Sequence, residues 1–242
     1  MRLFQLAYVC RTYGGLTQFD AGYLALLDET GGTLDFNSTV HMKALLVWLR
    51  LWGCRQFAVA YDELAAESIL RWAKRWESKL PDRFATLDRL SDGDIEEAGD
   101  AFAHLSRCLA SKRTRKGNQY DVQVGPTGSA KILFAARPRA FPPWDDAIRN
   151  NLGFDGSRHS YCEYLAEVRK QIKQLCSEAA ELGIPAGSIP LEVGRPLSTI
   201  PKLLDEYNWV TATKGFAPPE PSEIAKWYRW SSQPVHRADE SA

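Results

Sequence analysis

Two adjacent aspartates are the residues of this chain whose type and position could most readily do chemistry. Asp145 and Asp146 follow the Pro-rich stretch 138–144 and precede a short helical pattern at 146–153. A carboxylate can stabilise positive charge that builds up in a transition state, or it can activate a water molecule. The structural alternative is a helix N-cap, a position at which Asp is strongly preferred. If Asp145 is the reactive group, Asp146 could be the cap or could modulate the pKa of its neighbour.

The charges of the chain are unevenly distributed. Its 242 residues contain 30 Lys and Arg against 30 Asp and Glu, so the formal net charge is zero. Residues 91–106 nevertheless hold five acids and no Lys or Arg, whereas 107–120 hold five bases and no acid. Such a basic run could bind phosphate, or it could be a solvated loop whose cations complement the end of the preceding helix. We expect the phosphate contacts to come from Lys112, Arg113, Arg115 and Lys116.

A Gly-Pro turn follows the basic run directly and opens an apolar helical segment near 127–136. The first backbone N–H groups of a helix have no partner within it, and they lie at the positive end of its dipole. The turn therefore predicts a site for an anion such as a DNA phosphate. A Gly-rich helix start can instead serve close packing of two helices. The residues expected at this site are Gly125, Thr127, Gly128 and Ser129.

The combination resembles the helix-hairpin-helix DNA glycosylase superfamily, which includes endonuclease III and the 8-oxoguanine and alkyladenine glycosylases. The family pattern is a hairpin of the form LPGVG, a helix, and a catalytic Asp about twenty residues after the last hairpin Gly. Here 121–125 (DVQVG) matches the hairpin, and Asp145 follows Gly125 by 20 residues. Ile148 matches the apolar position after the family's Asp, which favours Asp145 over Asp146. The resemblance covers roughly residues 94–153.

Two departures from the family pattern shape the expected activity. Gln123 replaces the first hairpin Gly, and Thr127 stands where members with strand-cleaving activity carry a Lys. The resemblance therefore implies a monofunctional enzyme without a Schiff-base step. Lys131, one helical turn further on, is the weaker candidate for such a step; its alternative is a surface Lys or a DNA contact. The iron–sulfur cysteines of endonuclease III are absent, and we expect no cofactor.

A glycosylase must flip its target base out of the stack and hold it between aromatic side chains. The candidates for this base pocket all have core packing as their alternative: Trp144, Tyr120, Phe141 and Trp52, with Trp48 beside the last. The segment 195–215 is given no catalytic role. Its Lys202 and Lys214 could face DNA, whereas its apolar residues predict packing onto the other lobe.

The elements that must position these residues are predicted to be helices. Apolar residues at alternating steps of three and four predict helices near 94–109, 161–182 and 62–80, the last capped by Asp62, and an apolar central helix near 39–52. Weaker helices are expected near 16–28, 127–136, 146–153, 199–212 and 222–230. Only 3–9 and 57–60 could be short strands. The Gly- and Pro-rich stretches 183–199 and 215–222 are predicted to be connectors, and the polar tail 231–242 is expected to fray.

We therefore expect an all-α, two-lobed, helix-hairpin-helix glycosylase-like fold with a cleft between its lobes. One lobe would comprise 37–153 and the other 1–36 plus 154–242. Five scattered cysteines, four histidines without metal-ligand spacing and the lack of a secretion signal predict a cytoplasmic protein without a metal. No apolar run is long enough to span a membrane. We expect a monomer.

The expected function is a DNA glycosylase that flips a modified or damaged base from double-stranded DNA and hydrolyses its N-glycosidic bond, leaving an abasic site. The biological setting would be base-excision repair or defence against phages with modified DNA; one specialised alternative is similarity to bacterial anti-phage glycosylases that act on modified cytosine. The rival interpretations are a non-catalytic helix-hairpin-helix module that binds DNA or a protein, and a helical interaction protein with no DNA role.

Overall fold

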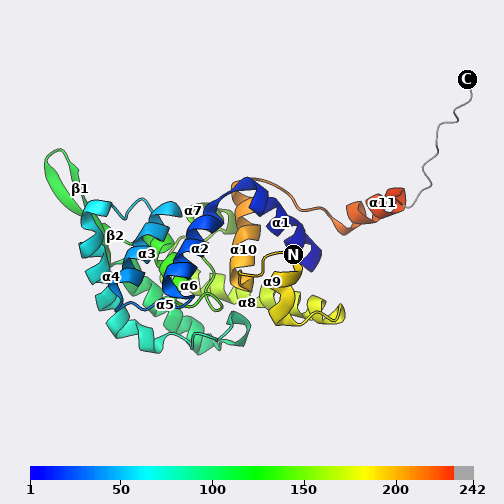
Figure 1. Cartoon of the computed structure of the whole chain (residues 1–242), viewed down its shortest axis with the longest axis horizontal. Coiled ribbons are helices and arrows are strands. Elements are labelled where there is room, and N and C mark those ends of the chain that lie inside the picture. Colours follow the sequence, from blue (N-terminus) through cyan, green and yellow to red (C-terminus); the bar gives the residue numbers. More distant parts are fainter. Residues whose placement is uncertain (232–242) are drawn as a thin grey trace, which may run out of the picture.

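The chain is dominated by α-helices, as its periodicity predicts. The structure is a computed structural model that describes residues 1–231, with the side chains of Phe19 and 227–231 left out. Within that range it contains eleven α-helices and one two-stranded sheet (Figure 1). The helices are α1 (Leu3–Leu16), α2 (Phe19–Thr30), α3 (Thr39–Leu51), α4 (Asp62–Trp76), α5 (Asp92–Ser106), α6 (Gly125–Ala136), α7 (Asp146–Leu152), α8 (Arg158–Glu181), α9 (Ile189–Glu192), α10 (Ile200–Asn208) and α11 (Pro221–Ser231).

The main helices begin at side-chain caps. The Ser91 hydroxyl accepts a hydrogen bond from the backbone N–H of Asp94, and the Asp94 carboxylate accepts one from the backbone N–H of Ser91; this capping box starts α5. Ser157 caps α8 and Thr199 caps α10 in the same way. Each cap satisfies a backbone donor that the helix itself leaves unpaired. The helices expected near 94–109, 161–182 and 199–212 are confirmed, with α10 continuing as a π-helical segment, Trp209–Thr213.

Some sequence expectations are wrong at the level of local structure. Residues 3–9, expected as a possible strand, form part of α1, and 57–60 lead into a short 3₁₀ turn, Val59–Tyr61. Asp62 is not the N-cap of α4, because it lies in the first turn and pairs with Arg50 on α3 (2.5 Å). In these cases a tertiary contact decides the conformation, which a short period-2 or capping pattern does not reveal.

A β-hairpin stands where the sequence predicts a loop and a short helix-to-helix turn. Strand β1 (Leu109–Arg115) pairs antiparallel with β2 (Asn118–Gln123), so the expected hairpin at 121–125 is mostly strand. Lys116 and Gly117 form the two-residue turn, both with positive φ (50° and 78°). Nearly all of β2 is exposed, so its sequence lacks the apolar alternation that would have predicted it. The motif is thus a helix, a β-hairpin and a helix, α5–β1–β2–α6.

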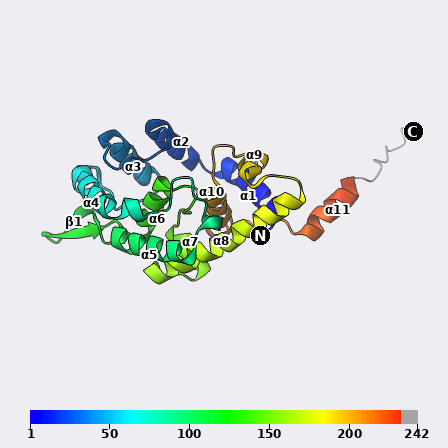
Figure 2. The same ribbon diagram turned by 90° about the horizontal axis from the view of Figure 1, so that it is seen from below.

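One continuous hydrophobic core runs through the molecule, from Leu6 on α1 to Leu204 on α10. It includes residues of both expected lobes. Gly99 allows α5 to pack tightly against α8, because a Cβ at that position would overlap the sulfur of Cys162. Figure 2 shows α2 and α3 on one side of the body and the long α8 on the other.

The two ends of the long axis carry elements that project from the body. The tip of the β1–β2 hairpin extends from one end and α11 from the other, in both views (Figures 1 and 2). Among residues 1–231, no helix has the length and apolar character needed to cross a membrane. Apart from Ser231, the polar tail that the sequence predicts to fray lies outside the described residues.

Candidate active site

Asp145 is both a helix cap and part of a charged site. It is the N-cap of α7, and its Oδ1 accepts a hydrogen bond from the backbone N–H of Ile148 (2.9 Å). The cap requires only this oxygen. The side chain is half-buried, and the loop before it is anchored in the core by Trp144 and Phe141, each with no exposed area. The structural interpretation of this Asp is therefore correct, and it leaves the carboxylate available for a second role.

Asp146 is exposed to solvent, unlike the half-buried Asp145. Its side chain is 76% exposed and forms an ion pair with Arg149, one turn further along α7. The hydroxyl of Thr127 donates to the same carboxylate oxygen (3.2 Å), and it accepts a hydrogen bond from Arg149 (3.0 Å). Asp146, Thr127 and Arg149 thus form a clamp between α6 and α7.

Lys131 is a buried residue, not a surface one. Its side chain lies within the body, and its Nζ donates to the backbone carbonyl of Trp52 (2.6 Å) while lying 5.5 Å from the centre of the Trp52 ring. Burial raises the pKa of the neighbouring Cys54 thiol; the Lys131 ammonium lowers that pKa and the Asp145 carboxylate raises it. Both charged groups therefore act on Cys54, as expected if Lys131 reaches the same region as Asp145.

A charged cluster on α10 completes the site, and the sequence did not indicate it. Lys202 is only 1% exposed and does not face solvent. Its Nζ lies 3.1 Å from Glu206 Oε1 and 3.5 Å from Asp205 Oδ2. The ammonium also lies over the rings of Tyr13 (4.6 Å) and Trp52 (5.1 Å), which places it within reach of cation–π attraction.

Arg195 and Asp20 extend this cluster to the edge of the molecule. Arg195, in the connector after α9, forms ion pairs with Asp20 on α2 and with Glu206 (2.8 Å). Within residues 1–231, Glu206 Oε2 and Arg195 Nε are buried without a hydrogen-bond partner. An unsatisfied buried polar atom costs free energy, so a bound group that pairs with it gains affinity.

The surroundings of the cluster bring the pKa of one carboxylate, Asp205, close to neutral pH. Burial raises the pKa of Asp205 to about 7; the Lys202 ammonium lowers this pKa, and the Asp145 carboxylate raises it. Burial alone would lower the pKa of Lys202, but the carboxylates of Glu206 and Asp205 outweigh it and raise the pKa above its ordinary value. Lys202 therefore stays charged at neutral pH while Asp205 exchanges its proton there. A carboxylate pair in which one member is easily protonated is the arrangement that acid–base chemistry uses.

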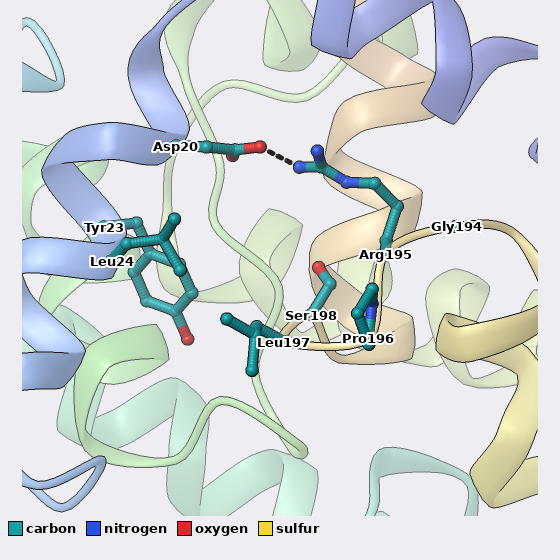
Figure 3. Close-up of a pocket in the computed structure, with 8 residues that line it drawn as sticks. All are labelled: Asp20, Tyr23, Leu24, Gly194, Arg195, Pro196, Leu197 and Ser198. Atoms are coloured by element: carbon teal, nitrogen blue, oxygen red, sulfur yellow. Dashed lines mark hydrogen bonds and ion pairs between the residues drawn. The ribbon is translucent and has the colours of Figure 1, made fainter.

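A cavity of about 160 Å³ opens beside this cluster. Asp20, Tyr23 and Leu24 of α2 face the connector 194–198 across it, and the Asp20–Arg195 ion pair closes one side (Figure 3). Its volume is close to the roughly 150 Å³ of a protein cavity that holds one benzene ring. A single six-membered ring is therefore the size of group that it can accept.

Most of the predicted base-pocket residues pack in the core. Trp52 is a core residue, 8% exposed, with its ring beside those of Tyr23 (5.9 Å) and Phe134 (6.1 Å), and it also contacts Lys131 and Lys202. Trp144 and Phe141 pack in the core, as does Trp48, so the alternative interpretation holds for them. Tyr120 is 45% exposed on β2 and belongs to the hairpin. Tyr23, which the sequence did not single out, is the aromatic residue that lines the cavity.

The predicted phosphate site at the start of α6 is only partly accessible. Gly125 has a positive φ (67°), and the side chain of Thr127 is engaged in the Asp146 clamp. Gly128 is buried so tightly that an added Cβ would meet Gln56 Nε2 at 2.8 Å. Ser129 is fully buried and donates to the carbonyl of Gly125 (2.9 Å). Gly128 and Ser129 therefore serve helix packing, which was the alternative considered for a Gly-rich start.

The Lys and Arg residues predicted to contact DNA lie on the projecting hairpin. Arg113, Arg115 and the turn residue Lys116 are exposed, and Lys112 is half-buried.

The chain matches no protein-family model, no curated protein and no solved structure. Its function must therefore be argued from its own residues and geometry.

Proposed function

We propose that this protein is a DNA glycosylase with a two-lobed helical architecture in which the α5–β1–β2–α6 motif stands in place of the expected helix-hairpin-helix. The observation that carries the proposal is a chain of charged contacts that runs from Asp145 to a cavity of the size of one ring. The charges of Asp145 and Lys131 both act on Asp205, and the ammonium groups of Lys131 and Lys202 both lie against Trp52. Glu206 in turn pairs with Arg195, which lines the cavity together with Asp20. Asp145, Lys131 and Trp52 come from 37–153, whereas Asp20, Arg195 and α10 come from the remainder. A site assembled from both parts is what the proposed division into lobes requires.

The chemistry assigned to the site is hydrolysis of the bond between C1′ of the sugar and the base nitrogen. As this bond breaks, positive charge develops on the sugar, and the Asp145 carboxylate stabilises it. A water molecule adds to C1′ and gives up a proton, which Asp145 accepts, while the departing base takes the bonding electrons. The base then receives a proton from solvent water, and Asp145 returns its own proton to the solvent, so that one water molecule is consumed in total. The ammonium groups of Lys131 and Lys202 favour the negative charge that the base acquires as it leaves. The products are an abasic site and a free base.

The proposal is tested by incubating the protein with duplexes that carry a panel of damaged and modified bases, including hypermodified phage DNA. The expected result is release of at least one base, seen as strand cleavage after alkali, with little cleavage before alkali because no Schiff-base step is proposed. Asp145→Asn should largely abolish this release, and Asp146→Asn is its matched control, because it removes the same charge from the exposed neighbouring side chain. Failure to release any base while DNA is still bound would favour a non-catalytic DNA-binding module. Absence of DNA binding as well would favour an interaction protein.

A further inference from the structure

We propose that the β1–β2 hairpin is a ribbon that enters the major groove of a DNA duplex and presents Arg113, Arg115 and Tyr120 to it. This inference rests on the proposed glycosylase function for the presence of DNA, and it names the surface that holds the duplex. The sequence predicts only that this basic segment contacts phosphate. The inference goes further, because it names the face of the ribbon that contacts DNA and the groove that the ribbon enters.

The base of the hairpin is attached to the body, and its tip projects beyond it. Ser111 is buried at its base, where its hydroxyl donates to the backbone carbonyl of Gln56 (2.6 Å). From Arg113 onward β1 is exposed, and β2 is exposed at every position but Val122. Figure 1 shows the tip extending past α4. A two-stranded ribbon with open faces is the shape that the major groove, about 12 Å wide, admits.

The two faces of the ribbon differ in charge. Directly paired residues share a face, so Arg113 lies beside Tyr120, and Arg115 beside Asn118. On the opposite face Lys112 is paired with Asp121, with 3.9 Å between Nζ and Oδ1. The first face therefore carries two positive charges and no acid, whereas the second is neutralised.

The side chains of the first face suit a DNA groove. Guanidinium groups bind phosphate or the O6 and N7 atoms of guanine, and Asn is suited to the edge of adenine. Tyr120 adds an exposed apolar ring that can lie against a base or sugar edge. An acidic protein partner would also attract two arginines, but it would not require an extended ribbon of groove width. A duplex satisfies both the charge and the shape.

The base of the ribbon is tied to the proposed active site. Arg113 Nη2 donates to the backbone carbonyl of Arg55 (3.3 Å), and Gln56 Nε2 donates to that of Val124 at the start of α6 (2.7 Å). Arg55 is three residues from Trp52, which a chain spans in about 11 Å at most. The base of the ribbon is therefore anchored within about 11 Å of Trp52 along the chain. The left-handed turn at Lys116 and Gly117 matches the natural twist of the strands, so the ribbon is shaped before DNA binds.

The test is a fluorescence anisotropy titration of an unmodified 25-base-pair duplex at several salt concentrations. The Arg113→Ala/Arg115→Ala variant is compared with Lys170→Ala/Lys173→Ala, which removes the same charge from exposed positions of α8. We expect the ribbon variant to lose at least about tenfold in affinity at low salt, and its slope of log K against log[salt] to fall by about 2. The α8 variant should change by less than about twofold. In the wild-type complex, guanine N7 should be protected from dimethyl sulfate, which attacks it from the major groove.

Wild-type affinity and slope in the ribbon variant would overturn the proposal, as would full reactivity of guanine N7 in the complex or a wild-type protein that does not bind DNA. Both arginines are exposed, so unchanged thermal unfolding is expected to show that the variant is folded. Base release by an enzyme that does not need the ribbon would remove this inference and leave the glycosylase function intact. DNA binding that depends on the ribbon, without release of any base, would support the ribbon inference and contradict the glycosylase function.

Discussion

At the scale of single residues, the site depends on charges placed where water is scarce. Asp145 is held by its own helix cap, and the cap also fixes the direction of the carboxylate. Its identity as a candidate could be predicted from the spacing to Gly125. Lys202, Asp205 and Glu206 could not, because a Lys followed by acids three and four positions later is equally the pattern of a solvated helix face. Only the packing of α10 against α1 and α8 makes them buried.

Lys202→Met should destabilise the protein strongly. The substitution leaves Glu206, with no exposed area, without one of its two cationic partners, and breaking a buried pair costs about 3–5 kcal/mol. Lys173→Met on exposed α8 is the control and should cost less than about 0.5 kcal/mol. Urea unfolding of both variants measures the difference. Equal stabilities would mean that the cluster is solvated.

Asp205→Asn should change how stability depends on pH. The folded pKa of about 7 exceeds that of an unfolded Asp, so between about pH 4 and 7 the folded chain holds a proton that the unfolded chain has released. The free energy of unfolding of the wild type therefore falls as pH rises through this window, and Asn removes that contribution. Between pH 5 and 8 the variant should gain on the order of 2 kcal/mol relative to wild type. The measurement is the free energy of unfolding of both proteins by urea at each pH. If this free energy changed with pH in the same way in both proteins, the burial of Asp205 would be contradicted.

At the scale of elements, helices with an apolar stripe were predictable and the exposed ribbon was not. The core faces of α5 and α8 repeat every three or four residues, which gives their positions within a few residues. The ribbon is held by backbone pairing and a two-residue turn while its side chains face solvent, so no hydrophobic pattern marks it. The short turn between two helices that was expected at 121–125 was also wrong. It was inferred from the spacing of 20 residues between Gly125 and Asp145, and that spacing says nothing about the conformation of the residues before Gly125.

The contact between α5 and α8 gives a prediction at this scale. Gly99→Ala should destabilise the protein by about 1–3 kcal/mol, because the added methyl group would overlap Cys162 and force the helices apart. Gly93→Ala, in the exposed first turn of the same helix, has room for the methyl group and should stabilise by about 0.5 kcal/mol through the better helix propensity of Ala. Thermal unfolding distinguishes the two. A loss of stability at both positions would show that helix propensity does not govern α5 here.

At the scale of the whole molecule, a neutral chain separates its charges into an acidic helix and a basic ribbon. The composition alone argues against nucleic acid, and only the order of residues restores the possibility. The hydrophobic core is continuous from α1 to α10, so the two proposed lobes share it. The site lies where residues of both meet.

A shared core predicts one cooperative unfolding transition for the body of the protein. Circular dichroism at 222 nm and the fluorescence of the buried tryptophans should give the same midpoint, because neither proposed lobe keeps a complete core without the other. Two separated transitions would instead show that 37–153 folds independently of the remainder.

The central claim is that the charge of Asp145, beyond its capping bond, drives base release. The most direct measurement is the single-turnover rate of base release by wild type, Asp145→Asn and Asp145→Ser on the substrate that the wild type cleaves. Asn and Ser both cap helices well, so each variant should keep wild-type stability and DNA affinity. Loss of the carboxylate should slow release by about 10²-fold or more in both. Wild-type release rates in the capped variants would contradict the account and leave Asp145 as a helix cap alone.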